Sequence, residues 1–293
     1  MIGFLGQIGQ KLADRWVALV AMPGLLYVVA VTVAAVLGQD HALSYPDLSR
    51  KLTAWAAGPT LKSPGGAAIL VAVVLVGSVG AGLAATAGGR VVEATWTLSG
   101  RHVPARWLAG WRRDRSARLK EIADTSADPA VVRRAIERAD RICVIEPDCP
   151  TWIGDRLRAC HVRIDKAYGL DLPSAWPRLW LVFPDAVRAE LGAARDGFSA
   201  AARLAAWSVL YLLLGFWWWP AVPVAVAAGA TAMVRGRLAT GNLADLIEAA
   251  VDLHGTDLAA RLGDRPSVTP ETGGRLTTRM RKDRWDPDSP LAD

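Results

Sequence analysis

The chain has 293 residues, of which 52% are hydrophobic and 21% are charged, and its formal net charge is +6. The three cysteines, Cys143, Cys149 and Cys160, are odd in number and have no CxxC spacing, which argues against a disulfide framework. Tryptophan dominates the aromatic residues, with 13 Trp against 4 Tyr and 4 Phe. Because the indole ring prefers the membrane–water interface, this bias is typical of a membrane protein.

Three long runs without charged residues, at 17–37, 65–89 and 204–234, dominate the hydropathy of the chain. A helix needs about 20 mostly apolar residues to span the bilayer core, so the runs predict a multi-pass membrane protein. The first run exceeds the roughly 7–15 apolar residues of a secretory signal, and we expect an uncleaved first span. No ionisable residue lies within a run, which argues against the charged pathway of a secondary transporter.

The order of these runs predicts the organisation of the whole chain. The fold class expected is all-α, a multi-pass helical membrane protein with two transmembrane hairpins and a helical cytoplasmic module. The segments are a cytoplasmic N-terminal segment at 1–16, a first transmembrane hairpin at 17–89 with an external loop at 38–64, a cytoplasmic domain at 90–203, a second hairpin at 204–234, a cytoplasmic amphipathic helix at 235–262 and a disordered tail at 263–293.

A dense group of basic residues follows the second run and sets the predicted orientation. Its members are Arg101, Arg106, Arg112, Arg113, Arg115, Arg118 and Lys120, with Asp114 as the one acid between them. Short cytoplasmic loops are enriched in Lys and Arg. The bias predicts that both termini lie in the cytoplasm. The richness in Ala, Arg and Gly is associated with high-GC bacterial genomes, so the membrane expected is the bacterial inner membrane. Because the group directly follows a span, we interpret it as binding anionic lipid headgroups rather than nucleic acid.

The segment at 90–203 carries helix signals and no useful period-2 alternation, so it is predicted to be helical. Helices are expected at 106–123, 130–141 and 152–167, the last ended by Gly169 in a left-handed conformation. A further helix is expected to begin at Asp185 and to run into the third apolar run.

The third run is too long for one ordinary span. The sequence Trp217-Trp218-Trp219-Pro220 interrupts it near the middle, so we expect a hairpin. Each half is short, which leaves open whether the hairpin crosses the bilayer completely or is re-entrant.

One local cluster has residue types suited to catalysis. His161 and Asp165 are four residues apart and share a helix face, as a carboxylate and the imidazole that it orients would. No second histidine or zinc-like cysteine pair accompanies them. Surface ion pairing is the preferred interpretation, and no cofactor or metal is predicted.

Two further groups suggest packing surfaces. The small residues Gly77, Ala81, Ala84, Ala85 and Gly88 form a face along which another helix can approach closely, either within the monomer or between copies. The aromatic residues Trp176, Trp180 and Phe183 form a stripe, which we expect to pack the cytoplasmic module against the helix that begins at Asp185.

A set of short motifs resembles an uncharacterised family of bacterial, mainly actinobacterial, multi-pass membrane proteins. The motifs are Pro150-Thr151-Trp152-Ile153-Gly154-Asp155-Arg156-Leu157-Arg158-Ala159, then Tyr168-Gly169-Leu170-Asp171, Trp176-Pro177-Arg178-Leu179-Trp180 and Pro184-Asp185. The resemblance covers roughly residues 145–215 and implies a shared topology and cytoplasmic module. It lends no functional residue.

The sequence therefore favours a non-enzymatic inner-membrane protein that self-associates or docks a cytoplasmic protein partner, with membrane lipids as further partners and without nucleic acid. One alternative is an oligomeric channel or membrane-permeabilising effector that uses the Trp-Pro hairpin or the second run as its pore lining. A second alternative is a membrane-embedded enzyme that acts on lipid through His161 and Asp165.

Overall fold

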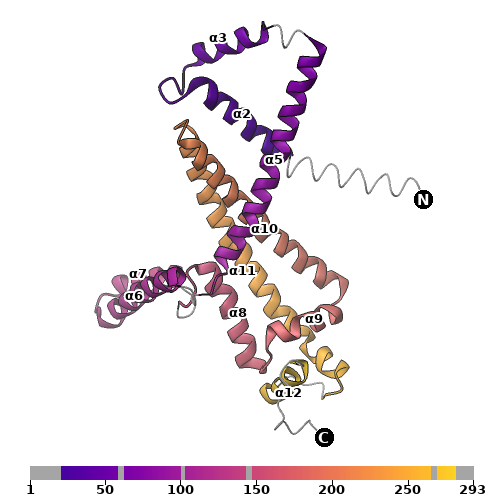
Figure 1. The fold of residues 1–293 in the computed structure, drawn as a ribbon. Helices are drawn as coiled ribbons and strands as arrows, with labels where there is room; N and C mark the ends of the chain where they lie inside the picture. Colours follow the sequence, from indigo (N-terminus) through magenta and orange to yellow (C-terminus); the bar gives the residue numbers. More distant parts are fainter. Residues whose placement is uncertain (1–20, 59–62, 100–102, 143–146, 265–268, 282–293) are drawn as a thin grey trace, which may run out of the picture. The chain divides into compact units, whose positions relative to one another are not determined.

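A computed structural model describes residues 21–58, 63–99, 103–142, 147–264 and 269–281 (Figure 1). Every regular element in these ranges is a helix, which confirms the predicted all-α class. The chain divides into a first unit, residues 1–93 with 199–235, and a second unit, residues 94–198 with 236–293. The predicted N-terminal segment 1–16 lies outside the described residues.

The first unit contains the apolar helices. They are α2 (Met22–Leu37), most of α5 (Pro64–Trp96), the second half of α10 (Asp185–Gly215) and the first third of α11 (Ala221–Arg261). Among the described helices, α5 and α10 are long and apolar enough to cross a membrane, and α2 is a shorter apolar helix.

Close contacts at small residues hold α5 against its neighbours within the first unit. A Cβ atom at Gly24 of α2 would lie 2.0 Å from the carbonyl oxygen of Ser78, and one at Gly88 would lie 3.1 Å from the Cβ of Ala206. A polar contact joins the two neighbours of α5 to each other, because the Tyr27 hydroxyl on α2 donates to the carbonyl of Leu210 on α10. The backbones of α2 and α5 can approach this closely only where a side chain is missing.

The predicted external loop at 38–64 contains a helix that sequence reasoning missed, α3 (Tyr45–Ala56). Ser44 precedes it in an extended conformation, and its hydroxyl accepts a hydrogen bond from the backbone N–H of Asp47. Such a cap satisfies one of the otherwise unpaired N–H groups of the first turn. The Ser44-Tyr45-Pro46 sequence, with Pro in the first turn, was a usable signal for this helix.

The third apolar run forms a helical hairpin, because α10 ends at Gly215 and α11 begins at Ala221. The two helices pair closely: the Ser208 hydroxyl donates to the carbonyl of Ala225. The sequence placed the break here correctly. The boundary between the two units falls after Arg235, next to the predicted boundary between the hairpin and the segment at 235–262. No helix end marks it, because α11 continues unbroken to Arg261. Arg235 and Arg237 change the polarity of the helix and do not end it.

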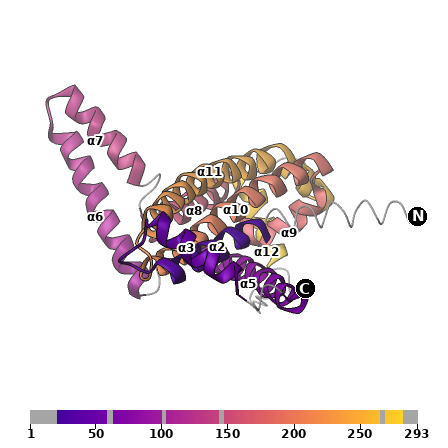
Figure 2. The ribbon, with the colours of Figure 1, turned by 90° about the horizontal axis from the view of Figure 1, so that it is seen from above.

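The second unit consists of helical pairs. The helices α6 (Val103–Thr125) and α7 (Pro129–Ile142) lie side by side (Figure 2). Two further helices, α8 (Trp152–Tyr168) and α9 (Leu172–Val182), meet at Gly169, whose φ of 64° is the left-handed conformation expected from the sequence. Asp171 then caps α9 by accepting a hydrogen bond from the backbone N–H of Ser174.

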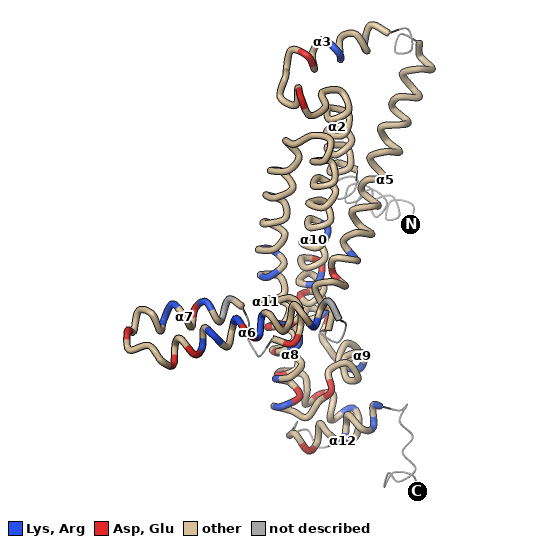
Figure 3. Tube along the Cα trace, turned by 60° about the vertical axis from the view of Figure 1, so that its left-hand side comes forward, with Lys and Arg blue, Asp and Glu red and all other residues tan. Residues whose placement is uncertain are grey.

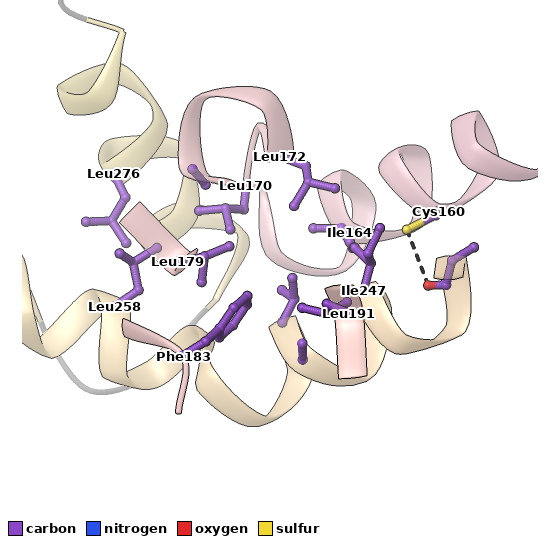
Figure 4. Close-up of a cluster of buried hydrophobic side chains, with 14 of the residues drawn as sticks. Cys160, Ile164, Leu170, Leu172, Leu179, Phe183, Leu191, Ile247, Leu258 and Leu276 are labelled. Carbon is purple, nitrogen blue, oxygen red and sulfur yellow. Dashed lines mark hydrogen bonds between the residues drawn. The ribbon is translucent and has the colours of Figure 1, made fainter. Parts of the chain in front are cut away.

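The core of the second unit combines residues from both of its sequence segments (Figure 4). Cys160, Ile164, Leu170, Leu172, Leu179, Phe183 and Leu191 come from α8 to α10, and Ile247, Leu258 and Leu276 come from α11 and the chain that follows it. Apolar residues from distant parts of the chain therefore share one core, and each fully buried side chain contributes about 1.5–3 kcal/mol.

The prediction of a disordered tail at 263–293 was wrong for part of this segment, which forms the helix α12 (Pro270–Met280). Thr269 caps this helix, and Leu276 and Met280 are buried in the core. A Cβ atom at Gly273 would lie 1.8 Å from the carbonyl oxygen of Tyr168, so α12 crosses the end of α8 at minimal distance. Sequence reasoning missed this helix because the segment is polar overall, and its few apolar residues lie on one face of the helix.

Candidate functional site

The residues with catalytic chemistry do not form an assembled pair. His161 and Asp165 both lie exposed on α8, and within the described part of the chain no hydrogen bond or ion pair joins them. Loss of hydration around the imidazole lowers the pKa of His161, against a smaller opposing effect of Asp171. Among the described residues, no group of three His, Cys, Asp or Glu side chains is arranged to hold a metal ion.

The basic group after α5 is divided by the structure. Arg106, Arg115, Arg118 and Lys120 are exposed on α6, whereas Arg113 is half-buried and Arg101 lies outside the described residues. The guanidinium of Arg115 stacks over the ring of Trp111, 5.3 Å from its centroid. These exposed residues fit the predicted contact with lipid headgroups. Figure 3 shows that basic and acidic residues both occur along α6.

Arg112 has a different role from the one expected of a headgroup ligand. Its guanidinium lies 2.6 Å from Oδ2 of Asp155, whose side chain is 0% exposed, and it also donates to the carbonyls of Cys149 and Ile142. A side chain with these partners is not available to lipid. This role could not be predicted from the sequence, because the two residues that form the ion pair come from different helices.

Asp155 completes this buried cluster by closing the loop before α8. Its Oδ1 atom accepts hydrogen bonds from the backbone N–H groups of Asp148 and Cys149, at 3.0 and 2.9 Å. Nearby, the hydroxyl of Thr151 caps α8 through Gly154 and donates to the carbonyl of Trp96. The cluster is a fully bonded structural junction, since a buried charge is tolerated only with such partners.

The two described cysteines are buried and free. Burial, helped by the charge of Asp155, raises the pKa of Cys149 to about 11. Burial, helped by Glu248, raises the pKa of Cys160 to about 12. A thiol reacts as its thiolate, so neither side chain has the properties of a nucleophile at neutral pH.

The small-residue face of α5 is used largely inside the monomer. Ala85 is buried, Gly88 abuts Ala206, and a Cβ atom at Gly77 would lie 3.4 Å from the side chain of Val28. Ala81 is half-buried, and only Ala84 of the predicted set is exposed. A pore lined by this face would therefore require α2 and α10 to move away.

The aromatic stripe of α9 is divided between core and surface. Phe183 is 2% exposed and meets the ring of His254 on α11 edge to face, while Trp176 packs against the core from its edge. The ring of Trp180 contacts that of Trp176 in a tilted arrangement, with 6.0 Å between the ring centroids, but the side chain stays 36% exposed. Leu191 of α10 shares the core with Phe183, so the stripe packs toward the helix that was expected.

The remaining candidate for a functional surface, after the polar clusters described above, is the apolar exterior of the first unit. Exposed large hydrophobic side chains cover α5 in particular: Ile69, Leu70, Val71, Val73, Leu75, Val76 and Leu83. Only 11% of the most apolar window of α5 is buried. Lys, Arg, Asp and Glu are correspondingly rare along the apolar stretches of α2, α5, α10 and α11 (Figure 3). An exposed apolar surface of this extent is typical of a site that contacts either a membrane or another protein.

No protein-family model matches the chain, and neither a curated protein nor a solved structure is significantly similar to it. The resemblance to an actinobacterial membrane-protein family therefore stays a prediction. In the structure, its motif residues cap α8 and α9, close the buried cluster and supply Leu179 to the core.

Proposed function

We propose that the chain is a non-enzymatic integral membrane protein of the bacterial inner membrane that self-associates through its helical cytoplasmic module. The observation that carries the membrane assignment is the exposure of the apolar side chains of α5. The core helix of a soluble protein buries such residues, whereas a lipid-facing helix leaves them on its exterior. Both termini and the second unit are assigned to the cytoplasm on the distribution of arginine and lysine.

Alkaline carbonate extraction of expressing cells tests this assignment. An integral membrane protein stays in the membrane pellet, whereas a peripheral or soluble protein is released. Release of the full chain into the supernatant would contradict the proposal.

Self-association is assigned to the exposed side of α7. A shallow, largely apolar groove there is lined by Ala127, Pro129, Val132 and Ile136, and the charged residues Arg133 and Glu137 flank it. Ile136 is exposed although it belongs to the helix that packs on α6. In a two-fold symmetric interface, a contact from one residue of the first copy to a second residue of the other copy is repeated with the two copies exchanged. Two copies of α7 laid antiparallel can pair Arg133 with Glu137 twice, around an apolar centre.

Native mass spectrometry of the protein in mild detergent tests this interface. We expect a dimer that Ile136→Asp converts to a monomer, while the matched control Leu253→Asp, at another exposed apolar position of the second unit, leaves it intact. Arg133→Glu should weaken the dimer, and Arg133→Glu with Glu137→Arg should restore it. A monomeric wild type, or a double variant no better than the single one, overturns the assignment.

A further inference from the structure

Exposed aromatic side chains gather in two segments of the first unit. Phe216, Trp217 and Trp219 project from the α10–α11 turn, and Tyr45 and Trp55 project from α3. Tyr45 is 77% exposed and Phe216 is 75% exposed, which is unusual for such large side chains. We call these five residues the aromatic belt.

Two hydrogen bonds join the α10–α11 turn to the connection that leads into α3, so the two segments of the aromatic belt lie beside each other. The Gln39 side-chain amide donates to the carbonyl of Phe216 at 2.7 Å, and the Trp218 indole N–H donates to the carbonyl of Ala42 at 2.9 Å. Gln39 and Ala42 belong to the connection between α2 and α3. The α10–α11 turn therefore lies beside the polar connection that follows the C-terminal end of α2, within the same unit.

The helix α3 presents three large apolar side chains that the described part of the chain leaves exposed. Tyr45, Leu52 and Trp55 follow helical spacing on one face, and all three are exposed. Charged residues, among them Arg50 and Lys51, occupy other positions around the helix. The ammonium of Lys51 donates to the carbonyl of Val36 in the last turn of α2, so the side of α3 that carries Lys51 is linked to the end of α2.

We propose that the aromatic belt and the apolar face of α3 lie in the headgroup region of the outer leaflet, and that the α10–α11 hairpin crosses the bilayer completely. This inference rests on the proposed membrane function. An amphipathic helix with aromatic residues on its apolar face is suited to lie in the interface plane. Trp and Tyr side chains are enriched at that depth because one end of each ring system is apolar and the other can stay hydrated.

The alternative, a re-entrant hairpin, would bring polar groups to the middle of the membrane. The turn is bonded to Gln39, and Asp40 and His41 follow directly in the same connection. A hairpin that ended near the bilayer centre would place these groups in hydrocarbon, where a charged side chain costs at least several kcal/mol. A turn at the interface places them in water.

The helix lengths agree with a full crossing. From Ser199 to Gly215 the first-unit part of α10 rises about 24 Å, and from Ala221 to Arg235 that of α11 rises about 21 Å. The hydrocarbon core is about 30 Å thick. The belt residues of the turn occupy one interface, and Arg203 and Arg235 can extend their charged ends toward the other, which closes the remaining gap.

Spin labels on the full chain in liposomes measure the depth of these segments. Single cysteines replace Leu52, Ala54, Val73 and Trp217 in a Cys143→Ser background, with a variant lacking the added cysteine as the blank, since Cys149 and Cys160 are buried. Power saturation with oxygen, which concentrates in lipid, and with a water-soluble nickel complex gives a depth for each label. Ala54 is the matched control because it is exposed on the opposite side of α3 from Leu52.

We expect the Val73 label to be deepest, the Leu52 and Trp217 labels to lie at the interface and the Ala54 label to be in water. A Val73 label in water would contradict the membrane function itself. With Val73 in lipid, a Leu52 label as accessible to nickel as the Ala54 label would overturn the placement of α3. A Trp217 label as deep as the Val73 label would show a re-entrant hairpin and overturn the full crossing.

Discussion

At the scale of single residues, the ion pair of Arg112 and Asp155 illustrates how a charged group can be structural. Removing one partner of a buried pair leaves the other charge uncompensated, which typically costs about 3–5 kcal/mol. We expect Asp155→Ala to destabilise the second unit by about this amount, as a lower midpoint of thermal unfolding followed by circular dichroism in detergent.

The control for this prediction is Asp148→Ala. Asp148 pairs with Arg158 at 3.4 Å, but its side chain is largely exposed, and such surface pairs contribute about 0–1 kcal/mol. Equal effects of the two substitutions would show that burial of Asp155 does not determine its contribution.

The aromatic stripe allows a second comparison at this scale. Phe183→Ala should cost about 3–5 kcal/mol, because it empties a fully packed position in the core. Trp180→Ala should cost less, since its ring is partly in solvent. Thermal unfolding of the two variants measures the difference, and a larger loss for Trp180→Ala would contradict the packing described.

Residue roles were the least predictable part of the sequence. Gly169 as a helix terminator and the break at Trp217–Pro220 were predicted because both signals are local. The partner of Arg112 was not, because it lies 43 positions away and the pairing depends on the whole fold. Spacing alone also suggested His161 with Asp165, which share a helix face without forming a bond.

At the scale of elements, the crossing of α12 over the end of α8 depends on Gly273. The Cβ atom of Gly273→Ala would overlap the Tyr168 carbonyl, so we expect α12 to detach and expose its apolar face. Limited proteolysis should then cleave the chain after Leu262 faster than in the wild type.

The neighbouring glycine provides the control for that experiment. A Cβ atom at Gly274 meets nothing within 4 Å, and alanine is the better helix former by about 1 kcal/mol. Gly274→Ala should therefore protect the segment. Faster cleavage in Gly274→Ala, or unchanged cleavage in Gly273→Ala, would show that the close contact is not what holds α12.

Most elements were predictable from sequence, and the exceptions have two causes. The helices from α6 to α8 and the start of α10 were expected within a few residues because caps and glycines mark their ends. The helices α3 and α12 were missed because each has only a narrow apolar face in a polar segment. The length of α11 was missed because a change of polarity was interpreted as an end.

At the scale of the whole molecule, the proposed topology predicts which surfaces a membrane-impermeant maleimide can reach. A single cysteine at Asp40 should react in intact spheroplasts, and one at Asp124, exposed on α6 and outside the proposed dimer groove, should react only after lysis, with Cys143→Ser as the background. The buried thiols of Cys149 and Cys160 should stay silent because burial raises the pKa of each. The opposite pattern would reverse the orientation.

The division of the second unit into two sequence segments has a consequence for the order of assembly. Its core joins α8–α9 to the distal part of α11 and to α12, and the hairpin at 199–235 lies between them in the chain. When α10 and α11 pair, Leu191 and Ile247 are brought together without a long flexible loop having to close. In the proposed membrane topology, insertion of the hairpin would precede and nucleate the core of the second unit, and the bilayer would take part in the folding of the protein as well as hold the finished molecule.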